Sequence, residues 1–391
     1  MSWKHDVADV HLLPALAVAL PLLLAAQSIE EQEWHLDALD VYTAQAQARG
    51  DGVIVAVIDS GVDAKHPDLA GQVLPGAGFG RSKGTDGTTD GDGHGTGMAG
   101  IIAANGKGGG ALGIAPGAKI LPIASADEKE QFGLDAVAES IRWAADHGAK
   151  VVNMSLGFSS SMTPTLVKAV NYAIEKDVVL VAATGNEAKE VSAPANINGV
   201  IAVAGTNKAG KPWASSNVGA DTVLAAPAEG IVTIAPENVY ASGYAEMDGT
   251  SAASAIVTGV AALVRARHPE MPAKDVVNAL IKTATDLAEP GRDATTGFGM
   301  VNPMGALTAQ LPAVERNPLL PAPKPSTAQP TPTLAAQRPV QPVDMAARLP
   351  FVAAVAGGTA VMTGLLIALP AIRSRRPKPV VSERDTPPTP W

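Results

Sequence analysis

Short apolar runs alternate along the chain with stretches in which apolar residues recur every three or four positions. Residues 53–58 and 178–182 contain no polar residue, which is typical of strands buried on both faces of a parallel sheet. Residues 134–145 carry apolar side chains at helical spacing and precede Gly148, a residue suited to end a helix. The alternation predicts an α/β fold in which helices flank one doubly wound parallel sheet.

Three polar residues with the chemistry of a proton relay adjoin these elements. Asp59 follows the first strand, His94 lies in a glycine-dense turn before apolar residues 98–104, and Ser251 opens a helical pattern at residues 252–267. A serine hydroxyl needs a neighbouring imidazole to take its proton, and the resulting cation needs an anion on its far nitrogen. The sequence predicts Ser251 as the nucleophile, His94 as the base and Asp59 as the residue that orients the base.

Asn186 is a fourth candidate, because it follows the strand at residues 178–182 at the sheet edge where Asp59 is expected. A side-chain amide aimed at a tetrahedral oxyanion lowers the barrier by roughly 3 to 4 kcal/mol. We predict Asn186 and the backbone amide of Ser251 as the oxyanion hole. Taken singly, the candidate residues have ordinary alternatives as helix caps, tight loops or turns. Their joint order and placement favour catalysis.

Asp59, His94, Asn186 and Ser251, with the glycines and threonines around them, resemble the subtilisin-like (S8) serine peptidases. The order of aspartate, histidine and serine differs from that of chymotrypsin and of the α/β-hydrolases. The resemblance extends from about residue 34 to about residue 306. It implies an endopeptidase that cleaves polypeptides through an acyl-enzyme and needs no cofactor or metal for the chemistry.

Two further segments resemble the substrate-binding walls of this family. One follows residues 151–154, and its backbone would pair with an extended peptide by strand addition. The other would form the opposite wall of the pocket for the residue before the scissile bond. The residues of the two walls are Ser155, Leu156 and Gly157, and Ala183, Thr184 and Gly185. Without the resemblance, the first segment is equally well explained as a strand end and turn.

The two ends of the chain carry segments outside the domain. The apolar run at residues 12–26 predicts a secretory signal, with a retained anchor as the alternative. A proline-rich linker, an uncharged transmembrane helix and a basic tail are expected near the C-terminus, with the tail cytoplasmic and the catalytic domain extracytoplasmic. The predicted segments are 1–26 (signal), 27–52 (N-terminal extension), 53–311 (catalytic domain), 312–350 (linker), 351–372 (membrane helix) and 373–391 (tail).

This arrangement resembles the mycosins, the membrane-anchored subtilases of bacterial type VII secretion systems. Residues 33–39 resemble a mycosin N-terminus, which implies an arm that wraps the domain. Two features depart from the resemblance: the chain has no cysteine, and Ser254 and Ala255 stand where a proline usually follows the nucleophile. The alternatives are a scaffold of a secretion complex with secondary proteolysis and a general surface subtilase without a secretion partner.

Charge narrows the range of partners. The formal net charge of −9 argues against a nucleic acid. Residues 86–92 form an acidic, glycine-rich segment, for which a solvated loop is the favoured interpretation and a structural calcium site the alternative. The expected partners are therefore a polypeptide substrate, a membrane contacted through the C-terminal helix and a type VII secretion complex.

Overall fold

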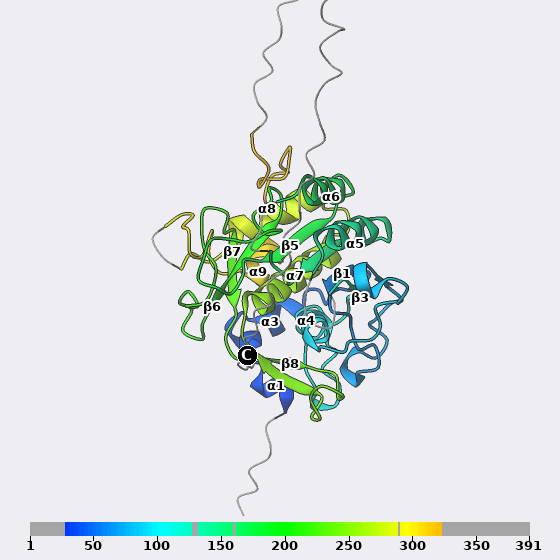
Figure 1. The fold of residues 1–391 in the computed structure, drawn as a ribbon. Helices are drawn as coiled ribbons and strands as arrows, with labels where there is room; N and C mark the ends of the chain where they lie inside the picture. Colours follow the sequence, from blue (N-terminus) through cyan, green and yellow to red (C-terminus); the bar gives the residue numbers. More distant parts are fainter. Residues whose placement is uncertain (1–27, 127–131, 159–161, 288–289, 323–391) are drawn as a thin grey trace, which may run out of the picture. The chain divides into compact units, whose positions relative to one another are not determined.

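The computed structural model describes residues 28–126, 132–158, 162–287 and 290–322 (Figure 1). The predicted signal, membrane helix and tail, and residues 323–350 of the predicted linker, lie outside the described residues. None of the helices in the described part of the chain combines the length and the apolar character that a membrane span requires.

A seven-stranded sheet with all pairs parallel forms the centre of the domain. Its strand order is β2-β3-β1-β4-β5-β6-β7, so the order of connection reverses at β1. The strands are β1 Ile54–Asp59, β2 Ala77–Gly78, β3 Lys119–Ala124, β4 Val151–Met154, β5 Val179–Ala183, β6 Ile201–Thr206 and β7 Leu224–Pro227. Every residue of β4 to β7 is buried, as expected for strands covered on both faces. The predicted parallel α/β sheet is confirmed.

Helices flank this sheet. The longest, α7, packs along β4, β5, β6 and β7 and against α4, while α5 and α6 lie side by side (Figure 1). The helices are α1 Ile29–Gln32, α2 Trp34–Ala38, α3 Val41–Gln45, α4 His94–Ala103, α5 Leu134–Asp146, α6 Pro164–Glu175, α7 Thr250–Arg267, α8 Ala273–Thr283 and α9 Pro303–Thr308. Thr163 caps the beginning of α6, because its hydroxyl accepts a hydrogen bond from the Leu166 amide at 3.2 Å.

Short elements complete the domain. An antiparallel hairpin, β8 Ile231–Ile234 with β9 Tyr244–Met247, packs through β8 against α4. Three 3₁₀ turns occupy Pro67–Leu69, Gly80–Ser82 and Lys107–Gly109. The hairpin leads directly into α7, so its position affects how that helix begins.

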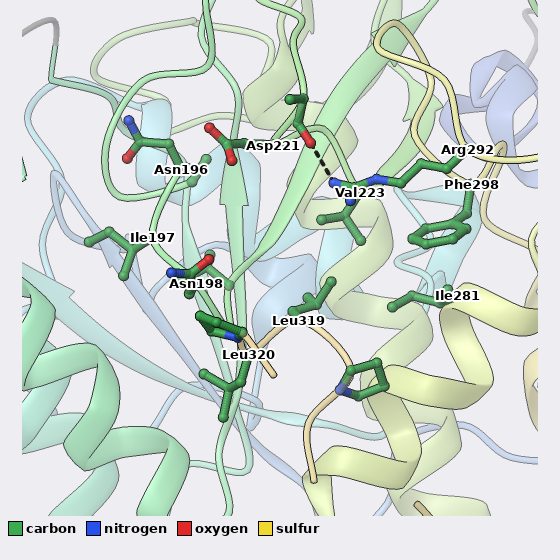
Figure 2. Close-up of a pocket in the computed structure, with 16 residues that line it drawn as sticks. Asn196, Ile197, Asn198, Asp221, Val223, Ile281, Arg292, Phe298, Leu319 and Leu320 are labelled. Carbon is green, nitrogen blue, oxygen red and sulfur yellow. Dashed lines mark hydrogen bonds between the residues drawn. The ribbon is translucent and has the colours of Figure 1, made fainter. Parts of the chain in front are cut away.

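The start of the predicted linker packs against the domain. The Val314 amide donates to Asp275 Oδ1 at 2.7 Å, and Asn317 is only 7% exposed. Leu319 and Leu320 line a cavity of about 220 Å³ (Figure 2). The proline-rich composition of residues 312–350 conceals these anchors, and the folded domain therefore continues beyond residue 311.

Residues 28–49, here called the N-terminal arm, belong to the same hydrophobic core. Leu36, Val41 and Ala44 have no exposed surface and pack within the main apolar cluster. The Gln45 side-chain amide donates to the carbonyls of Gly113 and Ile114 at 2.8 and 3.1 Å. The arm is thus an integral layer of the fold.

The arm buries two ionisable side chains. Glu33 is 2% exposed, and its Oε2 accepts a hydrogen bond from the Leu112 amide at 2.8 Å. Burial, reinforced by the charges of Glu30 and Asp68, raises the pKa of Glu33 to about 9. His35 is fully buried, neither ring nitrogen has a partner among the described residues, and burial lowers its pKa to about 3.

These shifts give opposite pH dependences of stability. Between about pH 4.5 and 9, folded Glu33 keeps a proton that the unfolded carboxyl loses, so its contribution to the free energy of unfolding decreases as pH rises. Between about pH 6.5 and 3, unfolded His35 gains a proton that the folded imidazole does not, so its contribution decreases as pH falls.

We expect Glu33→Gln to reduce the loss of stability between pH 6.5 and 9, because glutamine keeps the acceptor for Leu112 but does not ionise. Urea unfolding at successive pH values measures this effect. His35→Phe is the matched variant and should change the pH dependence of the free energy of unfolding only below about pH 6.5. Parallel curves for wild type and Glu33→Gln above pH 6.5 would contradict a protonated Glu33.

Candidate active site

The structure brings Asp59 and His94 into direct contact. Asp59 is the last residue of β1 and is fully buried, and its Oδ1 lies 2.8 Å from Nδ1 of His94. The amide and hydroxyl of Ser60 donate to the same oxygen at 2.8 and 3.3 Å. The His94 side chain is 26% exposed, whereas the Asp59 side chain is 1% exposed. The pair therefore joins a desolvated carboxylate to an imidazole that solvent can reach.

A close backbone approach makes this contact feasible. A Cβ atom on Gly95 would lie 2.1 Å from the Gly61 carbonyl oxygen and 3.0 Å from Cβ of Asp59. The Gly95 amide instead donates to the Ser60 hydroxyl at 3.0 Å. Glycine at this position lets the first turn of α4 approach the end of β1.

His94 begins α4, whereas the sequence pattern placed it in the preceding turn. Asp90 accounts for the difference: it is 5% exposed, and its Oδ1 accepts from the Gly93 amide at 2.9 Å. Its Oδ2 accepts from the amide and hydroxyl of Thr96 at 2.9 and 2.6 Å. Asp90 thereby satisfies amides at the beginning of the helix.

The acidic segment at residues 86–92 is more ordered than a solvated loop. Besides buried Asp90, Asp86 accepts hydrogen bonds from Thr88, and Asp92 accepts from the His94 amide. Among the residues that the structure describes, there is no group of three or more side chains suited to hold a metal ion. The carboxylates accept hydrogen bonds from the loop backbone, and structural calcium remains the alternative hypothesis for this segment.

Ser251 lies in the first turn of α7, which packs against α4. Its Oγ is 3.5 Å from the Ser155 carbonyl oxygen, at the limit of a hydrogen bond. Its own carbonyl accepts from the hydroxyls of Ser155 and Ser254 at 3.1 and 2.9 Å. The backbone of Ser251 is therefore fixed more firmly than its hydroxyl.

A buried polar network lies beneath this turn and escaped the sequence analysis. Asn153 Oδ1 accepts from Ser254 and Thr258 at 3.1 and 3.0 Å, and its Nδ2 donates to Ser155 Oγ at 2.8 Å. Asn153 interrupts an otherwise apolar strand, and this was the available signal. Although α7 lacks the usual proline near Ala255, these side chains hold its beginning.

The contacts of Asn186 determine the orientation of its amide. The Thr250 amide and hydroxyl both lie close to Asn186 Oδ1, at 3.0 and 2.8 Å. Because a backbone amide can only donate, the atom facing it must be the oxygen. Asn186 is exposed, and its Nδ2 donates to no partner within the described part of the chain. This amide nitrogen remains available to an incoming acceptor.

The two predicted substrate walls lie at neighbouring strand ends. Ser155, Leu156 and Gly157 follow β4, while Ala183 ends β5 and is followed by Thr184 and Gly185; the two strands pair directly. Ser192 connects the walls, which the sequence did not reveal. Its amide and hydroxyl donate to the Thr184 carbonyl at 3.0 and 2.9 Å, and a Cβ on Gly157 would lie 2.6 Å from Ser192 Oγ.

The cavity of Figure 2 is separate from these residues. Its lining includes Gly199 and Val200 before β6, and Val223 before β7, together with Arg292. These positions mark the amino ends of the strands, whereas Asp59 marks a carboxyl end. In parallel sheets, functional side chains gather at the carboxyl ends.

Comparison with known proteins agrees with this geometry. The model of the subtilase family (Peptidase S8) matches residues 50–299, and the chain belongs to this family of serine peptidases. Fervidolysin of Fervidobacterium pennivorans is 38% identical over 317 residues, which cover 73% of this chain and 45% of fervidolysin. Subtilisin DY of Bacillus licheniformis is 37% identical over 264 residues, covering 66% of this chain and 92% of that protein.

Among solved structures, the chain is similar to the MycP3 protease from the type VII (ESX-3) secretion system. The TM-score is 0.63 with 32% identity, and the match covers 71% of this chain and 88% of MycP3. The likeness to a mycosin is therefore present in both sequence and fold.

Proposed function

We propose that this protein is a serine endopeptidase in which Ser251 attacks a peptide carbonyl and His94 takes the serine proton. The contact of His94 Nδ1 with the buried Asp59 carboxylate is the observation that carries this proposal. Such a contact fixes the tautomer, so that the other ring nitrogen acts as the base, and it stabilises the imidazolium that forms.

The remaining steps use the same residues. The tetrahedral oxyanion accepts hydrogen bonds from Asn186 Nδ2 and the Ser251 amide, and the dipole of α7 favours the negative charge. His94 then gives its proton to the leaving amine, which leaves an acyl group on Ser251. Water, deprotonated by His94, attacks this ester and releases the acid. His94 passes the proton taken from water to Ser251 Oγ as the ester breaks, so the serine and the imidazole both regain their starting protonation states.

The substrate is proposed to be an extended polypeptide. The backbone of Ser155 to Gly157 would pair with it, and the side chain before the scissile bond would enter between the two walls. This arrangement is supported by the pairing of β4 with β5, which places the walls at one edge of the sheet.

The proposed setting is the outer face of a cell membrane, with the enzyme acting as a mycosin-like component of a type VII secretion system. Two features support this setting: the structural likeness to MycP3, and the uncharged residues 351–372 followed by a tail that carries Arg373, Arg375, Arg376 and Lys378. A scaffold role is the alternative. If the protein acts only as a scaffold, a Ser251→Ala chain would restore secretion in a deletion strain.

Ser251→Ala should abolish covalent labelling by a fluorophosphonate and hydrolysis of peptides, because no nucleophile remains. Mass spectrometry of the labelled peptide locates the reacting residue. Ser155→Ala is a useful comparison, since that hydroxyl lies nearby but has no assigned nucleophilic role. Label at another serine in the Ser251→Ala protein would refute the assignment.

Asn186→Ala should lower kcat by about 10²- to 10³-fold through loss of an oxyanion donor, as measured by steady-state peptide hydrolysis. Asn186→Asp separates the two roles of the side chain. Aspartate keeps an acceptor for Thr250 but replaces the donor, so kcat should fall at least as far. Wild-type kcat in Asn186→Asp would mean that Asn186 only supports Thr250.

A chain ending at Ala322 should be soluble after fractionation, whereas the full chain should sediment with membranes. This end point retains the packed residues Val314 and Asn317, so the domain is expected to stay folded. A chain ending at residue 372 is the matched control and should still sediment. If the shorter chain also sedimented, the anchor would have to lie in residues 12–26.

A further inference from the structure

Trp34 joins the N-terminal arm to a turn on the catalytic side of the domain. Its Nε1 donates to the carbonyls of Glu229 and Gly230 at 3.2 and 3.0 Å, across almost two hundred residues of sequence. Its ring packs against the hydrophobic core, and Lys208 Nζ lies 5.7 Å from the ring centroid. The indole ring is therefore fixed by packing and by the nearby Lys208 ammonium, while its N–H group donates hydrogen bonds.

The turn that Trp34 contacts, Ala228 to Gly230, is bonded to the residues just before the nucleophile. The Gly230 amide donates to Asp248 Oδ1 at 2.6 Å, and the Gly249 amide donates to the Ala228 carbonyl at 2.7 Å. These two bonds hold the turn, here called the clamp turn, against the entrance to α7. Gly230 adopts a φ of +63°, a conformation that favours glycine.

Both proposed oxyanion donors depend on this entrance. Thr250 directly follows Gly249 and bonds Asn186 Oδ1 through its amide and hydroxyl. Ser251, which supplies the second donor, is the next residue. A shift of the clamp turn would move Asp248 and Gly249, and with them the serine and the amide that orients Asn186.

The clamp turn also leads toward the histidine helix. Strand β8 begins directly after Gly230, and its Thr233 hydroxyl donates to the Gly97 carbonyl in α4 at 2.9 Å. A Cβ on Gly97 would lie 2.8 Å from the terminal methyl of Met247 in β9. The turn therefore lies between the arm on one side and both catalytic helices on the other.

We propose that Trp34 is a positioning residue: through the clamp turn and Asp248, the N-terminal arm fixes the beginning of α7 in its reactive geometry. This inference rests on the proposed peptidase function. Because the substrate walls come from β4 and β5, loss of the Trp34 bonds should affect the chemical step more than substrate binding.

The test is fluorophosphonate labelling of the full chain, in which Ser251 Oγ bonds to phosphorus, fluoride leaves and His94 takes the proton. Trp34→Phe keeps an aromatic ring but removes the donor. We expect its maximal labelling rate to fall about fivefold, as for the loss of one net hydrogen bond, with an unchanged half-saturating probe concentration. Trp143→Phe is the control, since Trp143 lies on α5 and stacks on His147.

Asp248 provides a second, independent test. Asp248→Asn keeps an acceptor for the Gly230 amide and should retain the wild-type labelling rate, whereas Asp248→Ala should lower it. Combined with Trp34→Phe, Asp248→Ala should cost less than the product of the single effects, because both act through one turn.

The possible outcomes are distinct. Wild-type labelling rates in both Trp34→Phe and Asp248→Ala would overturn the positioning role. A change in the half-saturating probe concentration alone, with an unchanged maximal rate, would also overturn it. If Trp143→Phe had the same free energy of unfolding as Trp34→Phe and slowed labelling equally, the effect of Trp34→Phe would be one of general stability, and the positioning role would be refuted. Failure of the wild-type chain to label at Ser251 would instead refute the proposed function.

Discussion

The hydrogen bond between Asp59 and His94 is the constraint around which the catalytic side of the domain is organised. The Asp59 carboxylate has no exposed surface at the end of β1, and its Oδ2 has no partner among the described residues. Burying a carboxylate is costly, and the contacts of Oδ1 with His94 and with the amide and hydroxyl of Ser60 offset that cost. The glycine at 95 permits the approach of α4, and buried Asp90 satisfies the amides with which that helix begins.

Contacts with other segments also position the serine. Ser251 comes from a helix that begins after a hairpin, and its position depends on contacts from two other segments. Asn153 in β4 accepts a hydrogen bond from Ser254 in the first turns of the helix, and Asn186 after β5 accepts from Thr250. Because these segments are remote in sequence and converge only in the fold, the reactive geometry is a property of the packed domain.

The sequence predicted the strands at residues 53–58 and 178–182, the helices at residues 134–145 and 252–267, and the pair Asp59–His94. Local patterns encode these features: uninterrupted apolar runs, helical spacing and strand-end polar residues. It misplaced the start of α4 because Asp90 caps that helix through a loop that looks merely acidic. It did not reveal the network at Asn153 or the role of Ser192, since these require partners from distant strands. The proline-rich composition also suggested a linker at residues 312–322, although the backbone of Val314 and the buried Asn317 attach this segment to the domain.

The N-terminal arm packs in the hydrophobic core and also contacts the clamp turn. Glu33 and His35 are both uncharged near pH 7, since burial shifts their pKa values in the directions that remove charge. The arm can therefore pack into the core without an unpaired ion. Trp34 donates to two carbonyls of the clamp turn, which ties the position of the turn to that of the arm. On this view, a chain with a detached arm would retain its catalytic residues but lose part of their alignment.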